Sequence, residues 1–127
     1  MTKDKILNDF RDLFISFLQN MYILAPNTIL THNSSMIESF IKQKINIVMD
    51  IYIKKVLIYK NEFNKNPELF ISTHDFQQDL QEFKEVNLDQ IFIFKNIWNK
   101  LNNDNKKIII QFISYFNQLS EKYLNLM

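Results

Sequence analysis

Residues 2–26 read TKDKILNDFRDLFISFLQNMYILAP, and their apolar positions decide the fold. The apolar stripe consists of Ile6, Phe10, Leu13, Phe17 and Met21, with Leu7, Phe14 and Leu18 beside it. Steps of three and four residues place such a stripe on one side of an α-helix, and the charged residues lie mainly on the other side. We expect Thr2 to cap this helix and Pro26 to end it near Leu24.

A second apolar stripe follows at steps of mostly four and sometimes three residues. It consists of Ile37, Ile41, Ile45, Val48, Tyr52, Val56, Tyr59 and Phe63. Ser35 and Glu38 fit a capping box at its start. The many β-branched residues favour a strand locally, but the helical period persists over roughly thirty residues. The stripe therefore predicts one long helix, bent near Asn46.

The remaining residues predict shorter helical elements and two further helices. Residues 66–68 place proline at a first helical position, and residues 67–86 show an irregular period that predicts one or two short helices. Residues 87–101 carry a third stripe, and residues 102–104 form a tight connection to the last helix. We expect an all-α fold: one domain over residues 1–127, with four main helices and short helical turns between the second and third.

The composition excludes several classes of site. The chain has 127 residues, no glycine and no cysteine. Phosphate-binding loops, dinucleotide fingerprints and nucleophile elbows need glycine, because the backbone turns tightly or approaches the ligand closely. Disulfides and thiolate metal sites need cysteine. We therefore expect no cofactor and no disulfide, and the net charge of +1 gives no general attraction to nucleic acid.

Histidines and paired carboxylates are the candidate catalytic or metal-binding groups. His32 and His74 are the two histidines, and His74 precedes Asp75. The carboxylate pairs at helical spacing are Asp75 with Asp79 and Glu82 with Glu85. A metal or proton-transfer site is conceivable here, but no second histidine lies at ligand spacing. We favour a solvated loop histidine and an exposed acidic face, with no catalytic and no metal-binding residue, and we expect no enzyme.

The charges are distributed unevenly along the chain. Residues 66–90 contain six acids and one lysine, a net charge of −5. Residues 34–65 contain six lysines and three acids, and residues 91–127 contain five lysines and two acids, so each flank carries +3. We favour an acidic segment that lies across the basic helices of its own chain. The alternative is a polarised surface that orients a partner.

Isoleucines outside the main stripe of the second helix are the candidate protein interface. Ile47, Ile51 and Ile58 give this helix apolar surface on more than one side. Either residues 67–86 cover them, or a partner does, since a monomer rarely exposes a large apolar patch. We favour a face that a partner covers.

Lysines of the same helix are candidate nucleic-acid contacts. They are Lys42, Lys54, Lys55 and Lys60, and Tyr52 and Tyr59 could stack on bases. The helix has no arginine, and both tyrosines belong to the core stripe, so we favour core packing. Trp98 is likewise expected to anchor the core.

No membrane span or secretory signal is expected. Residues 13–31 have no formal charge, but Gln19, Asn20 and Pro26 interrupt them. Acidic residues near the start of the chain are incompatible with the basic leader of a secretory signal. These features predict a soluble, cytoplasmic protein without membrane contact.

Three stretches carry a resemblance to a known group of proteins. They are Phe-x3-Phe-x2-Phe-Leu at residues 10–18, IYKNEF at 58–63 and IWNKL at 97–101, with Asn105-Lys106 and Tyr115-Phe116 later. This order resembles small all-helical proteins of large nucleocytoplasmic DNA viruses. Where those proteins tend to have Phe-Pro, this chain has Ala25-Pro26. The resemblance implies a helical fold and a location in the host cytoplasm or virion, and it implies no activity.

The favoured function is a non-enzymatic protein–protein interaction module, a subunit or adaptor of a larger assembly. A homo-oligomer is compatible with this function. The alternative is an accessory nucleic-acid-binding subunit that uses the lysines of the second helix. A survival regulator of the viral Bcl-2 type fits the size, but its glycine-containing motifs are missing.

Overall fold

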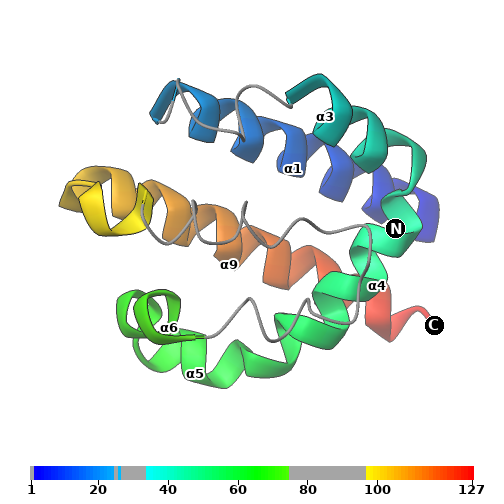
Figure 1. The fold of residues 1–127 in the computed structure, drawn as a ribbon. Coiled ribbons are helices and arrows are strands. Elements are labelled where there is room, and N and C mark those ends of the chain that lie inside the picture. Colours follow the sequence, from blue (N-terminus) through cyan, green and yellow to red (C-terminus); the bar gives the residue numbers. More distant parts are fainter. Residues whose placement is uncertain (1, 25, 27–33, 75–96) are drawn as a thin grey trace.

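The computed structural model of the chain describes residues 2–24, 26, 34–74 and 97–127. About 90% of these residues are helical and none lies in a strand, so the all-α prediction is confirmed (Figure 1). Within the described ranges no helix is long and apolar enough to cross a membrane.

The described helices differ widely in length. They are α1 (Lys3–Leu24), α3 (Ser34–Gln43), α4 (Ile45–Lys55), the 3₁₀-helix η1 (Leu57–Tyr59), α5 (Lys60–Lys65), α6 (Pro67–Thr73) and α9 (Asn103–Asn125). Residues 97–100 are also helical. Six α-helices thus lie in the described part of the chain, and the predicted four main helices are not reproduced there.

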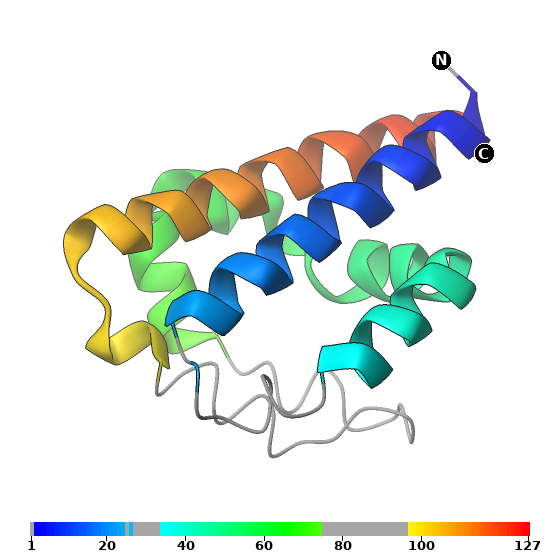
Figure 2. The same ribbon diagram turned by 90° about the horizontal axis from the view of Figure 1, so that it is seen from above.

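The two long helices form the centre of the fold. Figure 2 shows α1 and α9 side by side and antiparallel, with both chain ends at the same end of the pair. Both α3 and α4 contact α1, and α4 also reaches α9. The α5–α6 pair lies on the other side of α9 from α1 (Figure 1).

Short polar side chains begin the helices as expected. Thr2 Oγ1 accepts a hydrogen bond of 3.2 Å from the N–H of Lys5 at the start of α1. Asn66 Oδ1 accepts one from the N–H of Leu69 (3.1 Å), and Asn102 Oδ1 accepts one from the N–H of Asn105 (2.9 Å). Each bond satisfies a backbone donor that has no partner within its own helix. The predicted boundaries of α1 and the start of α6 are therefore confirmed.

The predicted long second helix is wrong, because the chain leaves α-helical geometry at two places. Lys44 separates α3 from α4 with φ −122° and ψ 34°, two residues before the bend predicted at Asn46. Val56 separates α4 from η1 with φ −122° and ψ −50°. The segment is rich in β-branched residues, which have low helix propensity, so packing decides its path. Ser35 lies inside α3, not at its cap, since α3 begins at Ser34.

Two apolar clusters make up the core. One lies between α1, α4, η1 and α9 and contains Ile6, Leu7, Phe10, Met49, Tyr52, Leu57 and Phe116. The other lies between the end of α1, α5, α6 and the start of α9 and contains Met21, Phe63, Phe70, Ile71, Ile97, Trp98 and Ile109. Phe17 packs against both clusters from a partly buried position, so it connects the two.

Two buried polar groups of the core are hydrogen-bonded. The Tyr52 hydroxyl donates to Asn117 Oδ1 at 2.6 Å, and Trp98 Nε1 donates to Ser72 Oγ at 3.0 Å. Tyr52 and Trp98 are both buried. The prediction that these two side chains pack in the core is confirmed, and their partners remove the cost of an unsatisfied polar group.

Burial of Tyr52 predicts a loss of stability in alkali. Burial raises the pKa of the Tyr52 phenol. In the unfolded chain this phenol loses its proton near pH 10, whereas the folded protein retains it, so rising pH favours the unfolded state. We expect the free energy of unfolding to fall by about 1.4 kcal/mol per pH unit above that point. Denaturant titrations across this range should show a shallower slope for Tyr52→Phe, and an unchanged slope would contradict the assignment. Burial and the charge of Glu38 raise the pKa of Tyr22 to about 12, so part of the slope is expected to remain in Tyr52→Phe.

Candidate protein-binding surfaces

The candidate interface isoleucines differ in exposure. Ile47 is 40% exposed and Ile58 is 62% exposed, whereas Ile51 is half-buried. Ile47 and Ile51 are four residues apart in α4 and therefore lie on the same side of it. Ile58 lies beyond the break at Val56, in η1. The structure thus leaves apolar side chains of α4 and η1 open to solvent.

Exposed lysines flank the isoleucines of α4. Lys44 precedes Ile47 by three residues, and Lys54 follows Ile51 by three. Steps of three, four and three keep all four residues on one side of the helix, which we call the α4 face. The opposite side of α4 is buried through Met49 and Tyr52 against α1 and α9. The α4 face is therefore the outer, amphipathic side of a helix whose inner side is fixed in the core.

The candidate nucleic-acid lysines do not share one surface helix. Lys42 and Lys54 are exposed and Lys55 is half-buried, and the two backbone breaks distribute the set over α3, α4 and α5. Lys60 Nζ donates to both carboxylate oxygens of Glu121, at 3.0 and 2.9 Å. Tyr52 is buried and hydrogen-bonded to Asn117, so its ring is not available for stacking on a base.

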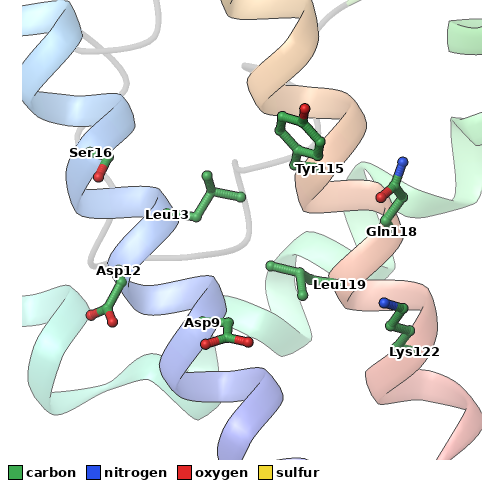
Figure 3. Close-up of a pocket in the computed structure, with 8 residues that line it drawn as sticks. All are labelled: Asp9, Asp12, Leu13, Ser16, Tyr115, Gln118, Leu119 and Lys122. Atoms are coloured by element: carbon green, nitrogen blue, oxygen red, sulfur yellow. The ribbon is translucent and has the colours of Figure 1, made fainter. Parts of the chain in front are cut away.

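An open groove of about 470 Å³ lies between α1 and α9 (Figure 3). Leu13 and Leu119 point into it from the two helices. One wall carries Asp9, Asp12 and Ser16, and the other carries Tyr115, Gln118 and Lys122. Sequence reasoning missed this groove, because its two walls meet only when α1 and α9 pair.

The acids of this groove are held by cations of their own helix. Asp9 pairs with Lys5 at 2.8 Å, and Asp12 pairs with Arg11 at 3.1 Å. The hydrogen bond to Asp9 and the Asp9 charge raise the pKa of Lys5. Both carboxylates of this groove are thus already paired within α1.

His74 lies in a second depression, of about 520 Å³, beside α5 and α6. Its ring stacks on Phe70 with 4.8 Å between centroids and lies 4.6 Å from Tyr59. His74 follows the end of α6, as the prediction of a loop histidine requires, but it is half-buried against aromatic rings and so only partly solvated. The other predicted metal or proton-transfer groups lie outside the described residues: His32, Asp75, Asp79, Glu82 and Glu85. Across residues 2–24, 34–74 and 97–127, no three potential metal ligands come together.

The structure describes residues 66–74 of the acidic segment at residues 66–90. Glu68 Oε1 pairs with Lys106 Nζ at 3.4 Å and so joins α6 to the basic C-terminal flank. This contact agrees with an acidic segment that lies against its own basic helices. Residues 75–90 of that segment lie outside the described residues.

Comparison with protein families, curated proteins and solved structures finds no match for this chain. The resemblance to viral proteins therefore stays a prediction. Function is inferred below from the surfaces of the chain itself.

Proposed function

We propose that this chain is a non-enzymatic protein–protein interaction module, a subunit or adaptor of a larger assembly, and that the partner binds over the α4 face and Ile58. The observation that carries the proposal is the exposure of Ile47 and Ile58 on consecutive elements. The inner sides of α4 and η1 pack in the core, so the outer side has a fixed shape before any partner arrives.

The area available is sufficient for a binding hot spot. The exposed fractions of Ile47 and Ile58 together equal about one whole isoleucine side chain. Covering that much apolar surface would contribute about 1.5–3 kcal/mol. Hot-spot residues at protein interfaces contribute on this scale, while the surrounding contacts mainly exclude water.

Nucleic-acid binding is the weaker proposal for the same region. Its lysines are divided by the breaks at Lys44 and Val56, and Lys60 is paired with Glu121. Tyr52 is buried in the core, so its ring cannot stack on a base. A protein partner needs none of these groups.

The proposal also includes a location for the protein. The resemblance to small proteins of large nucleocytoplasmic DNA viruses supports a viral assembly in the host cytoplasm or virion. A cytoplasmic site also agrees with the absence of cysteine from the sequence, since thiols and disulfides play no part in holding this fold.

Aspartate at position 47 tests the proposal. Ile47→Asp should leave the free energy of unfolding nearly unchanged and should abolish co-purification of the partner from the native source, because a charge would be buried in the interface. Ile108→Asp is a matched control: Ile108 is 38% exposed and lies on α9, away from the α4 face. It should retain the partner.

Two results would contradict the proposal. One is that both variants retain the same partners in equal amounts, and the other is that both variants lose the partners. Chemical denaturation of each variant separates loss of binding from loss of the fold.

A further inference from the structure

We infer that the segment docking on the α4 face is an acidic amphipathic helix, with two apolar side chains between carboxylates. This inference rests on the proposed function and specifies the chemistry of its partner. It follows from the charges around Ile47 and Ile51 and from the length of α4.

Unpaired lysines surround the apolar centre of the face. Lys44 and Lys54 flank Ile47 and Ile51, and Lys42 lies in the last turn of α3. None of these three lysines forms an ion pair with a described residue. Asp50, the one acid within α4, is exposed and lies three residues after Ile47 and four before Lys54, so two lysines of the face compete with one acid.

Some other lysines of the fold are paired with acids of a different helix. Lys60 pairs with Glu121 at 2.9 Å, and Lys106 pairs with Glu68 at 3.4 Å. Both of these pairs join separate helices. Lys44 and Lys54 have no such partner among the described residues and flank exposed apolar surface, so they can attract an outside anion, and charge complementarity would set the orientation of a docking segment.

The dimensions of the face fit one short helix. With a rise of about 1.5 Å per residue, Lys44 and Lys54 are about 15 Å apart along the axis, and Ile47 and Ile51 are about 6 Å apart. A partner helix of about three turns covers this length. Its apolar residues would be three or four positions apart, with a carboxylate about one turn beyond each, which is the pattern of an amphipathic helix.

Other occupants fit the face less well. A membrane surface gives about 1 kcal/mol for each nearby lysine, and the half-buried Ile51 cannot insert deeply. Nucleic acid would find no exposed aromatic ring within α4, since Tyr52 is buried. In a second copy, the two acids of the α1–α9 groove, Asp9 and Asp12, already pair with Lys5 and Arg11.

Selection from a displayed library of random 18-residue peptides tests the inference. The wild-type chain is the bait, and Ile47→Asp is the counter-selection bait. Enriched peptides should carry a net negative charge and apolar residues at helical spacing. Lys44→Glu with Lys54→Glu should weaken their binding about tenfold, because two attractive contacts become repulsive. The matched control is Lys100→Glu with Lys107→Glu, two exposed lysines elsewhere in the chain, and it should bind like the wild type.

The inference fails if the enriched peptides are neutral or basic, or if none is enriched. It also fails if their binding is unchanged by the Lys44/Lys54 reversal, or if the chain instead self-associates, pellets with anionic vesicles or binds nucleic acid through this face. Its failure is distinguishable from failure of the proposed function. If the native partner is lost with Ile47→Asp but retained by the Lys44/Lys54 reversal, the interface stands and the acidic partner does not. If the native partner is retained with Ile47→Asp, both proposals fail.

Discussion

Trp98→Ala is expected to lower the free energy of unfolding by about 3–5 kcal/mol, the usual cost of truncating a large buried aromatic side chain. Trp98 is 1% exposed and lies in the cluster that joins the end of α1 to α6 and the start of α9. Its Nε1 also donates to Ser72 Oγ, so the substitution leaves a cavity and removes a hydrogen bond. Denaturant titration measures the loss.

Two further variants separate these contributions. Trp98→Phe retains much of the apolar volume and loses the hydrogen bond, and Ser72→Ala removes only the acceptor. We expect both to cost less than Trp98→Ala. A loss below about 1 kcal/mol for Trp98→Ala would mean that the side chain is not in the core.

Phe10→Ala is expected to cost about 3–5 kcal/mol as well, and more than Phe17→Ala. Phe10 is 0% exposed and contacts the rings of Tyr52 and Phe116, at centroid distances of 5.5 and 5.3 Å. Phe17 belongs to the same stripe but is only partly buried. The two stabilities are measured by the same titration, and equal losses would contradict the burial that the structure assigns.

This difference shows what the helical period can predict. The period places Phe10 and Phe17 on one side of α1, and the structure confirms that side. The period carries no information on how far α3, α4 and α9 extend over each position. The relative burial of the two rings could therefore not be predicted. The ends of α1 and the start of α6 could be predicted, because capping side chains and proline act within a few residues.

The path of residues 34–65 shows a second limit. Apolar spacing continued through Lys44 and Val56, so the pattern predicted one helix. The hydrogen bond from the Lys44 N–H to the Phe40 carbonyl is retained at 2.8 Å, and the φ and ψ of Lys44 both depart from helical values and redirect the chain there. Such a bend depends on contacts with α1 and α9, which a local pattern does not contain.

The candidate surfaces were also predictable from the sequence only in part. Ile47 and Ile58 stand out in the sequence because they fall outside the apolar stripe, and the structure leaves both exposed. The α1–α9 groove and the contact of His74 with Tyr59 join residues far apart in the sequence, which local spacing does not connect. Sequence reasoning therefore named two isoleucines that are exposed and missed the groove.

Thiol protection at position 47 tests the central claim most directly. The chain has no cysteine, so Ile47→Cys and Ile108→Cys each introduce one thiol at nearly equal exposure. In the isolated protein the two thiols should react with an alkylating reagent at similar rates. In the assembly purified from the native source, we expect the thiol at position 47 to be protected and the thiol at position 108 to react as before. Equal reaction of both thiols in the assembly would contradict a partner that covers the α4 face.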